Sequence, residues 1–339
     1  MNKEEMKILE YLSDNLGYGG NILEMTKNIN KEYGPAYYPN IYNTIKKLEK
    51  IDIIDIKHEG NNKIIMLNTK NPLSIYYISE TENYKNQKIT IFRELLNDIL
   101  KLTQNFDIFS ICSLDTKQYL IMNRLELLIL NRNSNENIEL MKELHKLEYH
   151  YGMSIDPIIL TLNEFIDKIK TDELDIIIDL ILKKNIIYNI DGFWEIILEN
   201  SINTKYKKLD KYPQDITRDE LAYNYNRFGF QLYERFKPSD KIAIEPIIFS
   251  MSLNDEARIR YGSILLLYKN IENINLSYLF YIFKRYNKLS ELKGMLTLLF
   301  GSINEPYKNK IKSYINFIPD EPTIYNENTF KKYINIYTR

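Results

Sequence analysis

The sequence predicts a multidomain chain of α and α+β type, with an N-terminal unit of three helices and a hairpin, a central mixed sheet with helices, and a C-terminal all-helical part. Its 339 residues exceed the size at which a single hydrophobic core stops growing. Apolar residues form 44% of the chain and charged residues 27%, a composition typical of folded rather than disordered protein. Strand-like and helical patterns alternate between residues 106 and 200, whereas helical patterns alone follow Tyr206.

Residues 1–70 contain the three helices and the hairpin. Apolar residues recur at helical spacing over 3–14 and again over 21–29. Pro39 suits the first turn of a third helix that runs to about Lys50, because its missing N–H has no partner there in any case. Two β-branched runs then flank Gly60-Asn61-Asn62, which is a hairpin signal. Three helices followed by a hairpin describe a winged helix.

The rest of the chain predicts a connector, an α+β unit, a helical unit and a tail. Residues 71–105 carry one apolar stripe and predict a connector helix. The α+β unit, 106–200, has strand-like runs FDIFSICS, LELLILN, SIDPIILT and IIYN and helical runs ENIELMKELHKLEYHY and FIDKIKTDELDIIIDLILKKN. The helical unit, 206–318, has helical stretches at 217–236, 255–270, 275–287, 289–300 and 306–316. Residues 319–339 predict an irregular tail, since Pro319 and Pro322 interrupt any pattern there.

The third helix carries a resemblance to a known family. The run PNIYNTIKKLEKIDII resembles the recognition helix and first wing strand of winged-helix transcription regulators. The residues that carry the likeness are Tyr42, Lys46, Lys47, Leu48 and Glu49. The resemblance covers about 65 residues, and it implies a DNA-binding fold for this part of the chain.

A second resemblance covers the central unit. It is similar to the minimal nucleotidyltransferase fold of the polymerase β superfamily, in an archaeal type in which a winged helix precedes it. In the central unit the matching residues are Gly152, Asp156, Thr161, Glu164, Phe165, Lys183 and Lys184. In the connector they are Leu67, Asn68, Asn71, Pro72 and Leu73. Together the two resemblances cover about residues 4–192.

The active site of that family implies a specific set of residues. A Gly-Ser pair approaches the nucleotide phosphates, and the first Asp of an Asp-x-Asp follows the Ser by eleven residues. Residues i and i+2 of a strand face the same way, so both carboxylates can bind the two Mg²⁺ ions of phosphoryl transfer. A third carboxylate on a neighbouring strand activates the attacking hydroxyl.

This chain keeps the residue spacing of that active site, but the residue types at most of its positions differ. Cys112-Ser113 stands in place of Gly-Ser, Arg124 in place of the first Asp and Glu126 in place of the second, while Asp156 keeps the third carboxylate. Arginine carries a fixed positive charge where the fold needs an anion beside two cations. We therefore expect vestigial positions rather than catalytic ones, with no cofactor and no metal. An ion pair of Arg124 with Glu126 or with Asp156 is expected to fill the vacated metal site.

The candidate DNA-binding residues lie on the third helix and the hairpin. Hydrogen bonds to base edges or phosphates are expected from Tyr37, Tyr38, Asn40 and Asn43 at the start of the helix. Phosphate contacts are expected from Lys46, Lys47, Lys50, Lys57 and Lys63. Residues 1–70 contain ten lysines, no arginine and ten acidic residues, so any binding should be weak and salt-sensitive. A homodimer would strengthen it, because two half-sites double the contacts.

The whole-chain features favour a cytoplasmic protein without membrane contact. The formal net charge is −1, which excludes a basic surface over the whole protein. The single cysteine, Cys112, excludes an intrachain disulfide and suits a reducing compartment. We find neither a signal peptide nor a run of 18 apolar residues.

These features leave three functions open. The leading expectation is a regulatory or scaffolding protein that binds double-stranded DNA and carries a catalytically inactive nucleotidyltransferase-like domain. The second is a nucleotidyltransferase or nucleotide-sensing protein with altered metal ligands. A residual role, in which Arg124 and Ser113 bind a nucleotide or another phosphate without metal, also stays open. The third is a protein–protein interaction module that does not touch nucleic acid.

Overall fold

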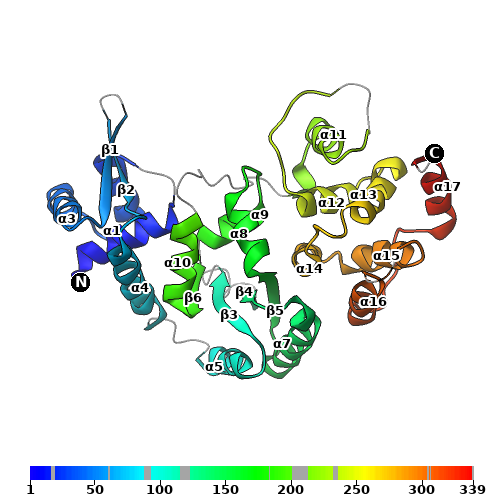
Figure 1. The fold of residues 1–339 in the computed structure, drawn as a ribbon, viewed down its shortest axis with the longest axis horizontal. Coiled ribbons are helices and arrows are strands. Elements are labelled where there is room, and N and C mark those ends of the chain that lie inside the picture. The colour runs from blue at the N-terminus through cyan, green and yellow to red at the C-terminus, as the bar shows by residue number, and fades with distance from the viewer. Residues whose placement is uncertain are drawn as a thin grey trace.

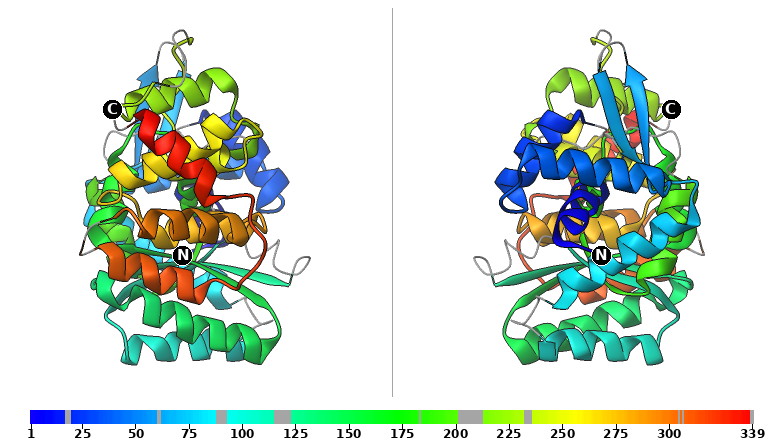
Figure 2. Two further views of the ribbon diagram at one scale, coloured as in Figure 1. Left: turned by 90° about the vertical axis from the view of Figure 1, so that its right-hand side faces the viewer. Right: turned by 90° about the vertical axis from the view of Figure 1, so that its left-hand side faces the viewer.

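The three parts of the chain follow one another along the long axis of the molecule, and the two termini lie toward opposite ends (Figure 1). The structure is a computed structural model that describes residues 1–16, 20–59, 62–87, 93–114, 123–182, 184–200, 213–231, 236–303, 305 and 307–337. It is a mixed α/β fold, mostly helical, with two small sheets. Viewed along the long axis, the C-terminal helices face the reader on the left of Figure 2 and the N-terminal unit on the right.

Three helices and a hairpin form the N-terminal unit, as the sequence predicts. They are α1 (Lys3–Asp14), α2 (Ile22–Glu32), α3 (Tyr38–Lys50), β1 (Ile54–Glu59) and β2 (Asn62–Leu67). A reciprocal capping box between Asn2 and Glu5 begins α1, and Pro39 occupies the first turn of α3. The second helix extends three residues beyond its predicted end at Ile29. The strands pair antiparallel, with Ile54 opposite Leu67; the predicted turn at 60–61 lies outside the described residues.

The connector differs from the single helix predicted over 71–105. The structure describes two helices, α4 (Pro72–Gln87) and α5 (Arg93–Lys101), with a short 3-10 turn, η1 (Leu102–Gln104), after them. Residues 88–92 between them, which carry the first part of the expected stripe, lie outside the described residues. The helix α4 packs against α1 and against α10 (Ile190–Asn200), so it joins the N-terminal unit to the central one.

The central sheet contains all four predicted strands. They are β3 (Ile108–Leu114), β4 (Arg124–Asn131), β5 (Ser154–Thr161) and β6 (Lys184–Tyr188), in the order β5-β4-β3-β6. Only β4 and β5 run parallel, because the helix α7 (Asn137–Tyr151) and the short turn η2 (Ser134–Glu136) carry the chain back between them. Gly152 ends α7 in the left-handed conformation, with φ of 63°.

The helix expected over FIDKIKTDELDIIIDLILKKN is two helices. They are α8 (Leu162–Lys170) and α9 (Ile176–Leu182). A capping box between Thr161 and Glu164 begins α8 directly at the end of β5. Asp175 precedes α9, and its Oδ1 accepts a hydrogen bond from the backbone N–H of Ile177 at 3.3 Å. Asp175 thus satisfies a backbone donor in the first turn of a separate helix.

The C-terminal unit is helical, as predicted, but its boundaries differ. Its elements are η3 (Pro213–Asp215), α11 (Arg218–Arg227), α12 (Ile244–Ser252), α13 (Ala257–Lys269), α14 (Leu276–Arg285), α15 (Leu289–Phe300), α16 (Tyr307–Phe317) and α17 (Glu327–Tyr337). The helix predicted over 217–236 ends at Arg227. The prediction of an irregular tail over 319–339 is wrong for α17, which packs on α13 by stacking Tyr333 on Tyr261, with ring centroids 5.5 Å apart.

The helix α14 covers the free edge of the central sheet. The backbone N–H of Ile159 donates to Ser277 Oγ at 3.0 Å, and Lys284 Nζ donates to the backbone oxygen of Ile155 at 2.9 Å. Pro157 lies between these two residues on β5, at an edge where its missing N–H breaks no ladder. An uncovered edge strand invites pairing with other chains, so α14 both protects the sheet and ties the C-terminal unit to it.

Candidate functional site

The strand register brings three of the five predicted site residues, Arg124, Glu126 and Asp156, together. Glu126 on β4 lies directly opposite Asp156 on the parallel strand β5. Arg124, two residues before Glu126, lies opposite Ser154. Because alternate residues of a strand point to the same side, Arg124, Glu126 and Asp156 share one face of the sheet. The sequence predicts this shared face correctly.

Ser113 does not join them, which corrects the expected pocket. Ser113 pairs with Leu127, one residue beyond Glu126, so its side chain points to the opposite face of the sheet. Its hydroxyl is buried and has no hydrogen-bond partner among the described residues. A nucleotide held by Arg124 could therefore not reach the Ser113 hydroxyl. A count of eleven residues across a loop does not fix the register of two strands.

Cys112 pairs with Leu128, so its side chain lies on the same face of the sheet as Glu126, but other charged groups act on it. Its thiol is fully buried, and burial raises its pKa well above the ordinary value. The charged groups that act on it are Lys184 and Glu82, on β6 and α4, rather than Glu126 or Asp156. The thiol is therefore a protonated core group.

Arg124 forms the predicted ion pair, and its partner is Asp156. Arg124 Nε bonds Asp156 Oδ2, and the Asp156 side chain is 0% exposed. The other carboxylate oxygen, Oδ1, lies 3.0 Å from Lys284 Nζ and accepts a hydrogen bond from Ser154 Oγ at 3.0 Å. Both oxygens of Asp156 are thus occupied by cations of the protein itself.

Glu126 pairs with a residue that the sequence reasoning missed. Arg285 Nη1 lies 3.1 Å from Glu126 Oε1, and Arg285 also donates to the hydroxyl of Tyr281, which in turn bonds Glu126. Lys284 extends the network to Glu148 on α7, at 3.0 Å. We call Arg124, Glu126, Glu148, Asp156, Tyr281, Lys284 and Arg285 the sheet cluster.

The last turn of α14 supplies two of the three cations in the sheet cluster. Lys284 and Arg285 follow Asp156 by more than 120 residues, so no local pattern links them to β5. The only available signal was a pair of adjacent cations at the end of an apolar helix, and this is also common at helix ends on electrostatic grounds. Their role becomes visible only once α14 is placed against the edge of the sheet.

The charges of the sheet cluster balance. Its three cations face three carboxylates. Burial raises the pKa of Glu126, while Arg285 and then Arg124 oppose that rise. Burial and Glu126 raise the pKa of Tyr281 far above its ordinary value, so the hydroxyl stays protonated and can donate. The cluster can hold the C-terminal unit on the sheet, and it presents no pair of free carboxylates to a metal ion.

Among the residues that the structure describes, no group of three or more His, Cys, Asp and Glu side chains could hold a metal ion.

A second buried network ties the C-terminal unit to the central one. Lys168 on α8 lies 2.9 Å from Asp175 and 2.7 Å from Glu245 on α12, and the hydroxyl of Tyr278 donates to Asp175. All four side chains have charged or polar partners, which is typical of a structural network.

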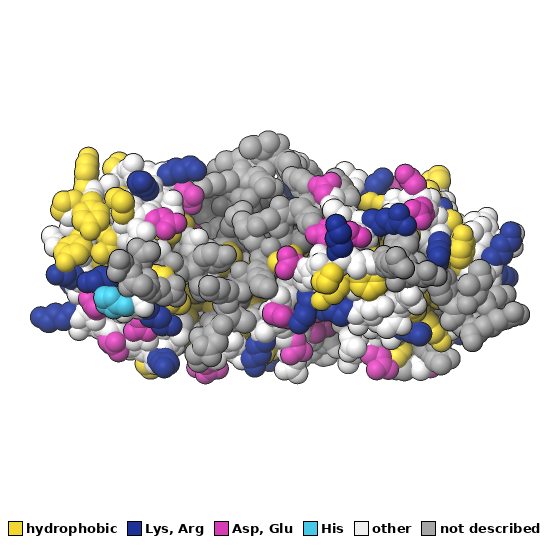
Figure 3. Space-filling model, turned by 90° about the horizontal axis from the view of Figure 1, so that it is seen from above, with side chains coloured by type: hydrophobic (Ala, Val, Ile, Leu, Met, Phe, Trp, Pro, Cys, Tyr) yellow, Lys and Arg dark blue, Asp and Glu magenta, His cyan; other side chains and the backbone are white. Residues whose placement is uncertain are grey.

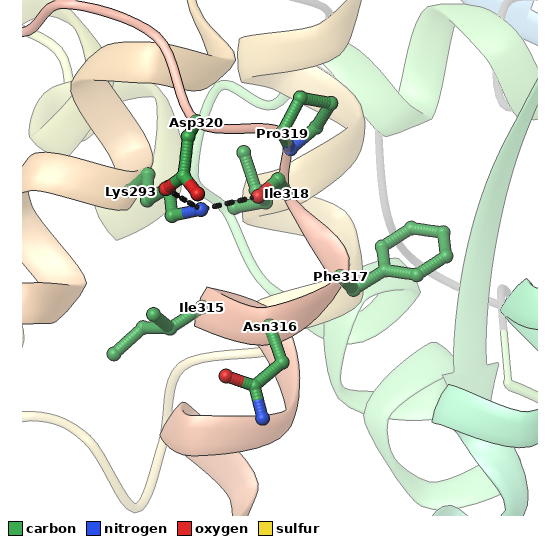
Figure 4. Close-up of a pocket in the computed structure, with 7 residues that line it drawn as sticks. All are labelled: Lys293, Ile315, Asn316, Phe317, Ile318, Pro319 and Asp320. Carbon is green, nitrogen blue, oxygen red and sulfur yellow. Dashed lines mark hydrogen bonds and ion pairs between the residues drawn. The ribbon is translucent and has the colours of Figure 1, made fainter.

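A hollow of about 470 Å³ lies at the end of α16 (Figure 4). Lys293 reaches across it and lies 2.6 Å from both the backbone oxygen of Ile318 and Asp320 Oδ1. Phe317 points away from these two side chains. The charged groups of this hollow neutralise each other, so it does not resemble a site that binds a charged ligand.

The predicted DNA-binding residues of α3 lie on its outer side. The core face of α3 carries Ile41, Ile45 and Leu48, which are buried. The exposed set on the helix and just before it comprises Tyr37, Tyr38, Asn40, Asn43, Lys46, Lys47 and Lys50. Lys57 and Lys63 are exposed on the hairpin strands. Figure 3 shows lysine and hydrophobic side chains together at this end of the molecule.

The lysines of α3 differ in how much of their charge is already used by partners within the protein. Lys47 forms an ion pair with Glu5 of α1, so part of its charge is used within the protein. Lys46 lies over the ring of Tyr42, with Nζ 4.6 Å from the ring centre, and Tyr42 stacks on Tyr38 at 6.1 Å. Asn43, Lys46 and Lys50 follow at intervals of three and four residues, so they form one outward stripe along α3.

Comparison of the chain with protein-family models, with curated protein sequences and with solved structures gives no match. Within the described part of the chain, no helix is both long and apolar enough to cross a bilayer.

Proposed function

We propose that this protein binds double-stranded DNA through its N-terminal winged-helix unit, as a regulator or scaffold, and that its nucleotidyltransferase-like domain is catalytically inactive. The observation that carries the proposal is the outward stripe of Asn43, Lys46 and Lys50 on α3. The exposed side chains of α3 include three lysines and one acidic residue, Glu49, although the N-terminal unit as a whole is neutral. A helix of this kind fits the major groove, where lysines neutralise phosphates and asparagine hydrogen-bonds base edges.

The hairpin supports the same orientation. Lys57 and Lys63 lie on adjacent strands, with Lys57 opposite Ile64 and His58 opposite Lys63. In a winged helix the hairpin contacts the backbone beside the groove that the third helix enters. Cations on both elements therefore suit one continuous stretch of duplex.

The sheet cluster supports the absence of catalysis. A divalent ion 4 Å from one of its cations, in surroundings with an effective dielectric near 20, would be repelled by about 4 kcal/mol per unit charge. Asp156 has both oxygens paired with protein cations, and Glu126 is held by Arg285 and Tyr281. Two-metal phosphoryl transfer needs these carboxylates free.

Duplex binding is tested by fluorescence anisotropy of a labelled duplex of mixed sequence at several salt concentrations. We expect binding that weakens steeply between about 50 and 200 mM salt. Lys46→Ala/Lys50→Ala should weaken it and reduce the slope of log K against log salt by about 2, since each phosphate contact contributes about 0.9. The matched control is Lys142→Ala/Lys146→Ala, which removes two exposed lysines at the same spacing from α7.

Two results would contradict the proposal. One is binding that is insensitive to salt, and the other is an equal loss of affinity in the α3 and α7 variants. Either result would favour a protein-interaction module, in which the stripe contacts a protein rather than a phosphate backbone.

A further inference from the structure

Three tyrosines lie at the start of α3, two of them largely in solvent. Tyr37 is 69% exposed and Tyr38 is 45% exposed, while Tyr42, one turn further along, is partly buried. Aromatic rings stabilise a fold mainly through the large area that they bury, so a ring left in water contributes little to it. Hydrophobic and lysine side chains occur together at this end of the molecule (Figure 3).

The two exposed rings have no evident part in forming the helix. Tyr37 occupies the N-cap position, where Ser, Thr, Asp or Asn would accept a hydrogen bond from the first turn, and its side chain makes no such bond. The core face of α3 is supplied by Ile41, Ile45 and Leu48. The first turn also has no acidic residue, although this end of a helix favours them. A phosphate that approaches the rings therefore meets no carboxylate in this turn.

Tyr38, Tyr42 and Lys46 form a ladder along one side of α3. They follow at intervals of four residues, which places them one above the other. The rings of Tyr38 and Tyr42 are nearly parallel, with an interplanar angle of 20° and centroids 6.1 Å apart. Lys46 Nζ lies 4.6 Å from the centre of the Tyr42 ring. Tyr42 covers one face of the Tyr38 ring, and because Tyr38 remains 45% exposed, its other face is open to a flat ligand.

We propose that the open face of Tyr38 stacks on an unpaired base, so that the winged-helix unit prefers DNA in which a duplex adjoins a single-stranded segment. Aromatic rings beside cations are the means by which proteins hold unpaired bases, since every base has a π face. Lys46 and Lys50 lie about 12 and 18 Å further along α3, at 1.5 Å per residue, where they suit the phosphates of the adjoining duplex.

The charges favour nucleic acid over a protein as the occupant of this surface. A protein partner would also cover exposed tyrosines, but the lysines that continue the ladder match a phosphate backbone. The inference rests on the proposed function, because the same helix holds the duplex part of the DNA.

Fluorescence anisotropy with two labelled DNAs tests the preference. One is a blunt duplex, and the other is the same duplex with a few unpaired nucleotides on both strands at one end, which makes a fork. We expect the fork to bind roughly tenfold more tightly, which corresponds to about 1.4 kcal/mol and lies within the range for stacking one base on an aromatic ring. A fork whose unpaired nucleotides lack bases keeps the phosphates and should lose this gain.

Substitutions separate stacking from phosphate contacts. Tyr38→Ala should bring the ratio of fork affinity to blunt affinity to about 1, whereas Tyr38→Phe keeps the ring and should keep the ratio. Lys50→Ala should weaken the binding of both DNAs alike and leave the ratio unchanged. Tyr149→Ala, the control, changes a tyrosine on α7 that is 89% exposed and should alter neither affinity. Circular dichroism confirms that each variant is folded.

The outcomes distinguish this inference from the proposed function. Salt-sensitive binding of the blunt duplex without tighter binding of the fork would overturn the inference and leave the proposed function standing. A fork preference that survives Tyr38→Ala, or that the base-free arms retain, would overturn the stacking role of Tyr38. Absence of binding to both DNAs would contradict the proposed function, and the inference would fall with it.

Discussion

Replacement of Arg285 by methionine removes the cation that holds Glu126 in the sheet cluster. Glu126 is buried, and Arg285 Nη1 lies 3.1 Å from its Oε1. Loss of one partner from a buried ion pair typically destabilises by about 3–5 kcal/mol, because the other charge stays buried. The Arg285 side chain is one-fifth exposed and Tyr281 still bonds Glu126, so we expect the lower end of that range, about 3 kcal/mol.

The structure also indicates which second substitution should recover the free energy of unfolding that Arg285→Met loses. Glu126→Met/Arg285→Met removes both charges and should regain most of the loss, since well-packed apolar residues often replace a buried pair without penalty. This double variant leaves the buried Tyr281 hydroxyl without its two partners, a defect of about 1–3 kcal/mol. Adding Tyr281→Phe should remove that defect as well.

The assay is urea unfolding followed by circular dichroism, with the free energy of unfolding taken from each curve. Lys146→Met, an exposed substitution on α7, serves as the control and should change stability by less than about 0.5 kcal/mol. The reasoning is refuted if Arg285→Met loses less than about 1 kcal/mol, or if the triple variant is less stable than Arg285→Met alone.

Four further outcomes can be measured directly. Lys168→Met leaves Asp175 and Glu245 buried without their cation, and urea unfolding should show a loss of about 3–5 kcal/mol; a loss below about 1 kcal/mol would contradict the ion-pair geometry. Because burial raises its pKa, Cys112 should not react with a thiol reagent at pH 8 until the chain is unfolded in guanidinium. Burial raises the pKa of Glu5, but hydrogen bonds to its carboxylate and the charge of Lys47 lower it, so the net pKa in the folded protein lies below 4.5. The ionised carboxylate therefore stabilises the folded state above pH 4.5. This stabilisation is lost as the pH falls through the lowered pKa of the folded state. Thermal melts should therefore show Glu5→Gln less stable than wild type at pH 7 and equal to it in strong acid. Calorimetry with ATP and GTP should show no binding that depends on Mg²⁺, and a saturable Mg²⁺-dependent signal would revive the enzymatic alternative.

Local sequence patterns predicted the helices and strands well where residues close in the sequence determine their bounds. The strand Ser154–Thr161 was predicted at its observed bounds, because Gly152 stops the preceding helix and Thr161 caps the next. The shared face of Arg124, Glu126 and Asp156 follows from strand alternation once the strands pair. An ion pair of Arg124 with one of these two carboxylates could therefore be foreseen, whereas the choice of Asp156 over Glu126 could not.

The features that the sequence did not reveal depend on distant partners. Lys284 and Arg285 join the sheet cluster because α14 lies along β5, and nothing near them in the chain indicates that. The misplaced Ser113 shows that spacing across a loop leaves strand register undetermined. The break between α8 and α9 depends on Asp175, whose partners Lys168 and Tyr278 are brought together by tertiary packing.

The cover that α14 places over β5 also has a consequence for synthesis of the protein on the ribosome. Arg285 follows Thr161, the last residue of β5, by 124 positions. At about 5–20 residues per second, β5 has left the peptidyl-transferase centre roughly 6–25 s before α14 is complete. During that interval the nascent sheet carries an open edge, and its Asp156 lacks Lys284. If synthesis terminates after β5 and before α14 is complete, the released chain has a β5 edge that is free to pair with strands of other chains. Premature termination in this interval should therefore yield aggregated fragments, whereas loss of α17 alone should not.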